Sequence, residues 1–127
     1  MKKLCLVLFL MIAVSSFMAG CANHNTAEES GPVLGIYELQ EADEPVKPNL
    51  VLEEQNRFVF NYSALSSYLP IGSYEVDQDY LTLKTDDGEY QYVFEIKNNT
   101  LVFHQEESSP ISLGNVEDGS VFVIQEK

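Results

Sequence analysis

The sequence has few of the side chains that carry most enzyme chemistry. It contains two cysteines and two histidines in 127 residues, and it shows neither a phosphate-binding loop nor the cysteine and histidine spacing of a zinc site. A serine nucleophile needs a neighbouring base, and His104 is the only histidine beyond residue 30. We therefore expect a protein that is not an enzyme and that holds no cofactor and no metal centre.

Positive charge is also scarce. Lysine and arginine together number 7 against 20 aspartates and glutamates, which gives a formal net charge of −13. A strongly acidic protein repels nucleic-acid phosphates and anionic lipid headgroups alike. We therefore expect no nucleic-acid partner.

A long apolar run occurs at the N-terminus. Lys2 and Lys3 precede a nearly unbroken apolar segment, 4–14, and small residues follow it up to Cys21. A positive region, an apolar region and a small-residue cleavage site, in that order, are typical of a secretory signal. The apolar run is shorter than the roughly 20 residues that span a bilayer. Residues 1–20 are therefore predicted to be a signal peptide that is removed after export.

The end of this segment, Met18-Ala19-Gly20-Cys21, resembles the bacterial lipobox, with Met18 where that motif usually has leucine. The resemblance implies that Cys21 receives diacylglycerol, whose two acyl chains give stable membrane anchoring. It also implies a place in the bacterial cell envelope, on the outer face of the cytoplasmic membrane. The alternative is an ordinary signal peptide that leaves Cys21 as a free thiol.

Removal of residues 1–20 takes away Lys2 and Lys3, so the formal charge of the remaining 107 residues falls to −15. That length suits one domain. It leaves no internal disulfide, because Cys5 lies in the removed segment. Residues 21–31 are polar and small, so we predict the lipidated cysteine and a flexible tether that spans roughly 17 Å. That span exceeds the Debye length of about 8 Å, so the domain at 32–127 can stay clear of the membrane.

Beyond Gly31 the apolar residues recur with a period of two, and turn signals interrupt them every eight to twelve residues. No stretch has a convincing helical period, so the fold class is all-β. The predicted strands are 33–40, 50–53, 57–62, 71–76, 80–85, 89–97, 100–105 and 120–125.

Short hairpin loops fix the register, because a slip of one residue turns every apolar side chain outward. We place two-residue loops at 78–79, 87–88 and 98–99, the last as a type I′ turn. A three-residue loop at 54–56 has Asn56 in the left-handed region and sets Glu53 opposite Arg57 as a pair of opposite charges. The apolar pairs that follow are Val76 with Leu81, Tyr74 with Leu83, Leu81 with Phe94, Leu83 with Tyr92, Phe94 with Phe103, Leu52 with Phe58 and Leu50 with Phe60.

About eight short antiparallel strands with one apolar face favour a single up-and-down β-barrel, since closure removes exposed edges. A two-sheet β-sandwich is the alternative. In outline this barrel resembles the small lipocalin-like domains of bacterial lipoproteins. The segment 69–122 also looks like a short domain of Firmicutes envelope proteins, a resemblance that implies a fold and no activity. Its residues are Gly72-Ser73-Tyr74-Glu75, Thr85-Asp86-Asp87-Gly88, Tyr92-Val93-Phe94, Thr100-Leu101-Val102-Phe103 and Asp118-Gly119.

Three loops, 63–70, 86–88 and 106–110, fall at the same end of this strand arrangement. Barrel mouths are usual places for ligands, and an acidic rim rich in hydroxyl groups could bind a cation, a sugar or a basic peptide. The alternative is that these residues only make turns and keep the protein soluble. The candidate binding rim consists of Ser66, Ser67, Tyr68, Asp86, Asp87, Glu106, Glu107, Ser108 and Ser109.

Three functions remain open. The first is a non-enzymatic binding or accessory module that engages an envelope protein or peptide through its acidic loop end. The second is a lipocalin-like carrier of a small apolar ligand, and the third is a hydrolase of cell-wall material. The apolar rows are bulky throughout, which predicts a filled interior in a barrel of this size and favours the first function over the second.

Overall fold

The computed structural model describes residues 31–126. The predicted signal peptide, the lipid-attachment residue Cys21 and all of the tether except Gly31 lie outside the described residues. The expectations for these segments therefore stay predictions.

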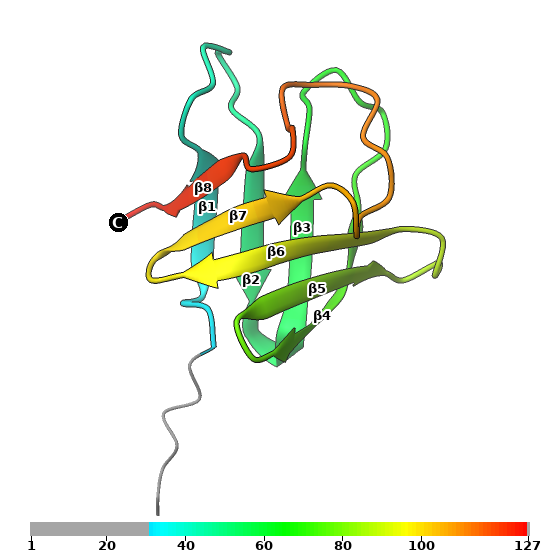
Figure 1. The fold of residues 1–127 in the computed structure, drawn as a ribbon. Helices are drawn as coiled ribbons and strands as arrows, with labels where there is room; N and C mark the ends of the chain where they lie inside the picture. The colour runs from blue at the N-terminus through cyan, green and yellow to red at the C-terminus, as the bar shows by residue number, and fades with distance from the viewer. Residues whose placement is uncertain (1–30, 127) are drawn as a thin grey trace, which may run out of the picture.

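The chain forms a closed barrel of eight antiparallel strands in sequence order, with β8 paired to β1 (Figure 1). The single up-and-down barrel is thus confirmed, and the two-sheet sandwich is not adopted. The elements are β1 (Gly35–Leu39), β2 (Asn49–Glu53), the short 3-10 segment η1 (Glu54–Asn56), β3 (Arg57–Asn61), β4 (Ile71–Asp77), β5 (Tyr80–Thr85), β6 (Gln91–Lys97), β7 (Thr100–His104) and β8 (Val121–Ile124).

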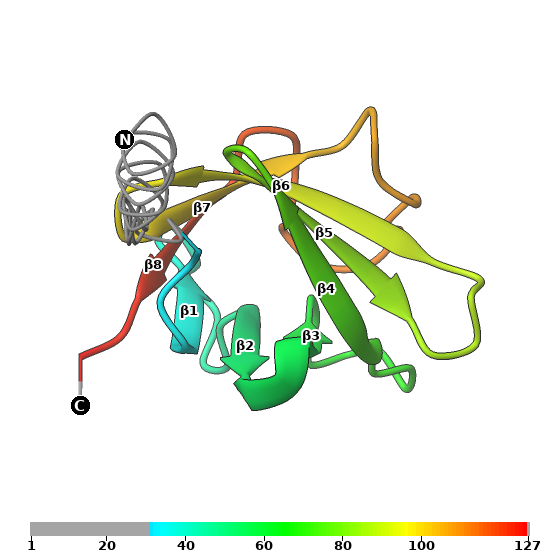
Figure 2. The same ribbon diagram turned by 90° about the horizontal axis from the view of Figure 1, so that it is seen from below.

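The arrangement in space follows from this order. In Figure 1 the strands β1, β2 and β3 form the rear wall, and β5, β6 and β7 cross in front of them. Figure 2, turned by 90°, shows the strands as a ring. Closure rests on a short seam between β1 and β8, where Tyr37 pairs with Ile124 and Leu39 with Phe122.

The predicted register is confirmed in all four hairpins, including Glu53 opposite Arg57. Asn56 lies in the left-handed region as predicted, and so does Gln55. The turn type at 98–99 differs from the prediction: Asn98 has a positive φ of 56° and Asn99 does not. A type I′ turn needs a positive φ at both central residues, whereas a type II′ turn needs it at the first alone.

The strands β1 and β6 each begin two residues later than predicted, because the regular pairing with a neighbouring strand ends there. β1 begins at Gly35, which pairs with Leu52 close to the point where β2 passes into η1. β6 begins at Gln91. Before it, the backbone N–H of Tyr90 donates to the Thr85 hydroxyl at 3.1 Å instead of to a strand carbonyl, so the ladder stops there.

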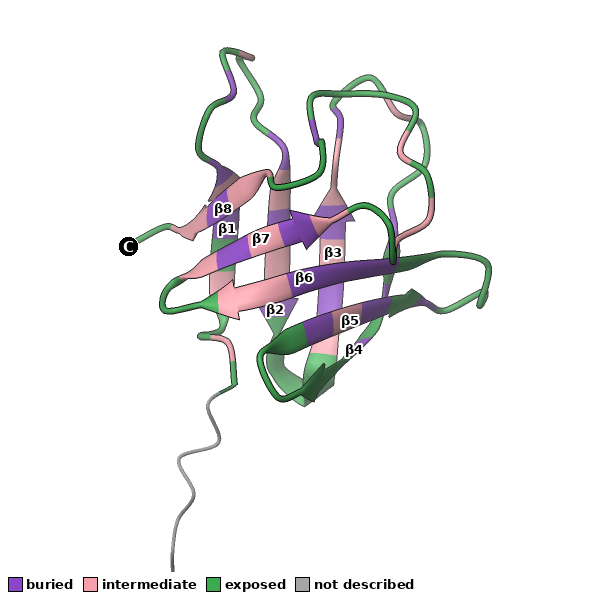
Figure 3. Ribbon diagram, viewed as in Figure 1, coloured by how far each residue is buried: buried purple, intermediate pink, exposed green. Residues whose placement is uncertain are grey.

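Aromatic side chains fill the interior. The ring of Phe60 on β3 lies 5.2 Å from Tyr92, 5.6 Å from Phe94 and 6.0 Å from Phe122, measured between ring centroids. These partners come from β6 and β8, which are not neighbours of β3 in the barrel, so the rings meet across the middle. Figure 3 shows buried positions along every strand in the view. The core consists of Tyr37, Leu39, Ala42, Leu50, Leu52, Phe58, Phe60, Tyr74, Leu81, Leu83, Tyr92, Phe94, Leu101, Phe103, Val116 and Phe122.

Val76 is the one apolar member of the predicted rows that is not buried, since its side chain is 40% exposed. It lies in β4 one residue before the strand ends at Asp77. The inward-facing position of Val76 is therefore at the rim of the barrel, where no further layer covers it.

Four connections, 40–48, 62–70, 86–90 and 105–120, lie at one end of the barrel, which we call the loop end. The opposite end, with the tight turns after β2, β4 and β6, is the hairpin end. Two of the connections cover the core: Ala42 and Val116 are buried within it. Gly114 has a φ of 92°, and a Cβ there would lie 2.5 Å from the Tyr62 carbonyl oxygen. The 105–120 connection thus packs tightly against the one after β3.

Candidate functional site

Tyr68 links two loops of the predicted rim. Its hydroxyl donates a hydrogen bond to the Asp87 carboxylate at 3.2 Å. Its ring lies 5.3 Å from that of Tyr90, with a tilt of 48° between the planes. Partial burial, followed by the nearby negative charge of Asp87, raises the pKa of Tyr68, so the hydroxyl remains a donor. The loops at 62–70 and 86–90 are therefore held together at the loop end.

The Thr85 side chain holds the Asp87 carboxylate in place through a hydrogen bond. The buried Thr85 hydroxyl donates to Asp87 Oδ1 at 2.5 Å, and the same oxygen accepts from the backbone N–H of Glu89 at 3.0 Å. The hydrogen bond from Thr85 is the main reason that the pKa of Asp87 lies below its usual value. The carboxylate therefore stays ionised, and the stability that it contributes is lost only as the pH falls through this lowered pKa.

Asp86 pairs with Arg57, the only arginine in the sequence. Two parallel hydrogen bonds join them, at 2.7 Å and 2.6 Å, the fork geometry that arginine favours with carboxylates. The guanidinium lowers the pKa of Asp86. The predicted pairing of Glu53 with Arg57 as opposite charges is confirmed by the register, and the guanidinium forms its hydrogen-bonded ion pair across β4, with Asp86.

Two serines of the candidate binding rim, Ser108 and Ser109, form side-chain hydrogen bonds with backbone groups. Ser108 Oγ accepts from Val93 N at 2.8 Å and donates to the His104 carbonyl at 2.6 Å. Ser109 Oγ accepts from Gln91 N at 2.9 Å. These two residues take the place of a neighbouring strand along β6 after β7 has ended. Their hydroxyl groups are therefore committed to the fold.

The other two serines of the rim differ from each other. Ser66 Oγ binds the backbone of Tyr68, accepting at 3.2 Å from its N–H and donating at 3.0 Å to its carbonyl. Ser67 is exposed and makes no side-chain hydrogen bond within residues 31–126. Ser66 thus shapes the loop that presents Tyr68.

Glu106 and Glu107 are exposed. In the described part of the chain, no side-chain hydrogen bond or ion pair joins them to the loops at 62–70 and 86–90. The predicted rim therefore divides into two parts: Tyr68, Asp86 and Asp87 meet in one cluster, and the residues 106–109 lie along β6.

Three members of this cluster were not predicted from the sequence. They are Arg57, Thr85 and Tyr90, and Arg57 had a signal in being the only arginine of an acidic chain. The connection that carries Tyr68 also exposes two leucines, Leu65 at 86% and Leu69 at 50%. We call the exposed group of Arg57, Tyr68, Asp86, Asp87 and Tyr90 the Tyr-Asp cluster.

The histidine that remained as a candidate base lies elsewhere. His104 Nε2 is 3.3 Å from Glu95 Oε2, and its ring packs edge-on against Tyr80 at 5.5 Å. All three residues lie on the outside of the barrel. Between residues 31 and 126 no three His, Cys, Asp or Glu side chains are grouped so that they could hold a metal ion. In the same range, no helix has the length and apolar character needed to cross a membrane.

Replacing Thr85 by valine tests whether the Thr85 hydroxyl holds the Tyr-Asp cluster in place. The change keeps the shape and removes the hydroxyl, so the Tyr90 N–H and Asp87 each lose a partner. Leaving such groups unsatisfied costs about 1–3 kcal/mol. We expect a loss of stability of this size in urea unfolding and a higher pKa of Asp87 in an NMR titration. Thr82→Val on the same strand is the control, and equal effects for the two variants would contradict the assignment.

An exposed pair of tyrosines beside a hydrogen-bonded carboxylate and a charge pair can bind another surface by stacking and by hydrogen bonding. Comparison with known proteins adds no assignment: no protein-family model, no curated protein sequence and no solved structure matches the chain.

Proposed function

We propose that this chain is an extracytoplasmic lipoprotein, anchored to the membrane through Cys21. Its barrel is a non-enzymatic binding or accessory module that engages an envelope protein or peptide at the loop end. The observation that carries the proposal is the Tyr-Asp cluster, in which exposed aromatic and charged side chains are already fixed in place.

Such a cluster suits recognition for two reasons. Tyrosine and arginine are enriched among the residues that dominate binding energy at protein interfaces. Side chains that are already ordered lose less conformational freedom on binding. Tyr68 and Tyr90 are ordered in this way by their mutual contact and by the hydrogen bond to Asp87, although their side chains are 38% and 37% exposed.

Charge indicates the kind of partner. The four connections of the loop end contain ten carboxylates and one lysine, Lys47. A surface of this sign attracts a basic partner and speeds its association. We therefore propose a basic segment with exposed apolar side chains, which would contact the tyrosines and leucines. The ten carboxylates are Glu41, Asp43, Glu44, Asp86, Asp87, Glu89, Glu106, Glu107, Glu117 and Asp118.

The position of the chain start supports the same reading. The described chain begins before β1, at the hairpin end, where Figure 1 shows it leaving downwards from the barrel. The four connections of the loop end are opposite. A barrel anchored through residues N-terminal to Gly31 would thus present the loop end away from the membrane.

The carrier and the hydrolase receive no such support. A carrier needs an interior that is not occupied by side chains, whereas Phe60, Tyr92 and Phe94 pack against each other across the middle of the barrel. A hydrolase needs an acid or base aimed at a reacting group. Each carboxylate of the Tyr-Asp cluster is already engaged, Asp86 by Arg57 and Asp87 by Thr85.

Replacing both Tyr68 and Tyr90 by alanine tests the binding role. The natural lipoprotein is cross-linked in intact cells, purified under denaturing conditions and compared with the double variant. We expect the double variant to capture at least tenfold less cross-linked partner than the natural chain does. A tenfold loss corresponds to about 1.4 kcal/mol in binding energy. The control is Tyr80→Ala, since Tyr80 is equally exposed, at 40%, on the outer wall of the barrel.

A second pair of variants tests the contribution of charge to partner binding separately from that of the tyrosine rings. Neutralising Glu106 and Glu107 with glutamine leaves the Tyr-Asp cluster intact and should weaken capture more at low salt than at high salt. Neutralising Glu54 and Asp79, which lie at the hairpin end, should leave capture unchanged. Partners that persist in the tyrosine double variant, or that are lost equally in Tyr80→Ala, would refute the proposed site.

A further inference from the structure

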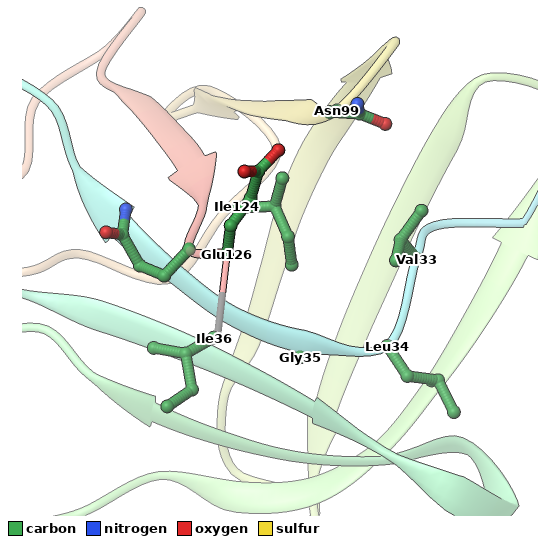
Figure 4. A pocket seen from close by; sticks show the side chains of 8 residues that line it. Val33, Leu34, Gly35, Ile36, Asn99, Ile124 and Glu126 are labelled. Carbon is green, nitrogen blue, oxygen red and sulfur yellow. The ribbon is translucent and has the colours of Figure 1, made fainter.

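A second surface lies at the hairpin end, at the opposite end of the barrel from the connections that carry Tyr68, Asp87 and Tyr90. It is a groove of about 810 Å³ beside the start of β1 (Figure 4). Val33, Leu34 and Ile36 contribute side chains that are 53%, 47% and 43% exposed. The remaining lining residues are Gly35, Ile124, Asn99, Gln125 and Glu126.

The groove arises because β8 is short. β8 pairs with β1 only from Tyr37 to Leu39, and beyond this seam the backbone N–H of Gln125 reaches the Ile36 carbonyl at 2.7 Å. Gly35 and Ile36 thus pair with β2 on one side, and the chain from Val33 to Gly35 borders an open space on the other. Figure 4 shows Ile124 on one side of this space and Val33 and Leu34 on the other.

The apolar residues of the groove are held in place. The hydroxyl of Tyr37 donates a hydrogen bond to the Val33 carbonyl at 2.6 Å. Burial raises the pKa of Tyr37 to about 12, so this donor remains protonated under all ordinary conditions. The backbone at Val33 is therefore fixed, and the side chains of Val33 and Leu34 stay exposed to solvent. Soluble proteins rarely expose a contiguous apolar surface in this way.

Charge is low around the groove. Glu126 is the single carboxylate among its eight lining residues, although the whole chain has 20 acidic residues. The neighbouring turn after β6 contributes Lys97, Asn98 and Asn99, and no acid. The groove and this turn would thus meet less repulsion from an anionic lipid surface than the ten carboxylates of the loop end.

The length of the chain before the groove indicates what covers it. Residues 22–30 separate the proposed lipid-attachment residue Cys21 from Gly31, and an extended chain of that length reaches at most about 35 Å. The groove adjoins the residues where this segment joins the barrel. Of all exposed apolar surfaces on the described part of the chain, it is the one that a lipid anchor holds nearest to the bilayer.

We propose that the groove rests on the lipid surface to which the chain is anchored, with Val33, Leu34 and Ile36 inserted at the level of the headgroups. The proposal rests on the proposed anchor at Cys21. It replaces the expectation of a domain that floats clear of the membrane with one of fixed orientation, in which the loop end faces outward.

The absence of tryptophan from the chain makes a direct test possible. The full lipidated protein with Leu34→Trp is inserted into phosphatidylcholine vesicles whose acyl chains carry bromine, a quencher of indole fluorescence. We expect a large loss of emission relative to vesicles without bromine. Val33→Trp serves as a second reporter in case the first variant does not fold. Leu65→Trp at the loop end is the matched control, and its emission should not change.

Each other outcome has a defined meaning. Unquenched emission from both groove positions, in protein that sediments with the vesicles, would overturn the lipid contact and leave the anchor standing. Equal quenching at position 65 would also overturn it, since the barrel would have no fixed orientation. A blue shift that depends on protein concentration, without quenching, would place a second copy in the groove. Protein that fails to sediment with vesicles would refute the anchor itself.

Discussion

Replacing Phe60 by alanine is expected to lower the midpoint of thermal unfolding by about 15–30 °C. Truncation of a buried phenylalanine to alanine costs about 3–5 kcal/mol, because the transfer energy is lost and a cavity remains. Each kcal/mol corresponds to roughly 4–8 °C in a domain of this size. Phe60 is the strongest case, since its ring contacts four other aromatic rings, from the connection after β3, from β6 and from β8.

The large effect follows from how the barrel is closed. Its total stability is about 5–15 kcal/mol, and no disulfide joins the described strands. Loss of Phe60 removes the contacts that connect the rear wall to the front wall through the interior. Calorimetry of Phe60→Ala beside Tyr80→Ala, which trims an exposed ring, provides the comparison. Similar midpoints for both variants would mean that the interior is not packed as described, and the carrier function would gain support.

The hairpins could be predicted because their information is local. In the turn at 98–99, the loop length alone sets Phe94 opposite Phe103, and the alternation of apolar residues then fixes the face. The seam between β1 and β8 has no such source, since some eighty residues of chain separate Tyr37 from Ile124. Closure was inferred only from the need to cover edges, and the groove beside the short β8 could not be foreseen.

The covering of the loop end was missed for a related reason. Val116 follows Ile111 and Leu113 at uneven spacing in a polar segment, and such spacing gives no period to interpret. Its burial depends on Gly114, whose positive φ lets the connection approach Tyr62. Gly114, two residues before Val116, is one signal of this packing in the sequence. It acquires meaning only once the position of the facing loop is known.

The candidate site was predicted in part. Three of its members, Tyr68, Asp86 and Asp87, follow from the topology that brings their loops to one end. Ser108 and Ser109 were predicted for the same rim, yet their hydroxyl groups satisfy the backbone of β6. Sequence alone cannot separate these roles, because a loop serine that binds a ligand and one that replaces a missing strand have the same chemistry and the same surroundings in the chain.

Replacing Cys21 by serine is expected to abolish incorporation of a radiolabelled fatty acid completely. Attachment of lipid to cysteine requires a thiolate, and a thiol ionises near pH 8.5, whereas the serine hydroxyl does not ionise at physiological pH. The unlipidated domain should then leave the membrane fraction, since the groove at Val33 and Leu34 offers only a small apolar contact. Its loss from the membrane should be complete on washing with buffer.

Cys5→Ser is the matched control, because Cys5 lies in the segment that is predicted to be removed. This variant should retain the full label and stay with the membrane, so that the effect depends on position and not on the number of thiols. Label that persists in Cys21→Ser would refute the lipobox assignment, and with it the reason for placing the loop end outward. Complete loss of label with retention in the membrane fraction would instead mean that the barrel binds the envelope independently of lipid. The Tyr-Asp cluster would then be the first surface to mutate, because its exposed tyrosines are held in place by their mutual contact and by Asp87.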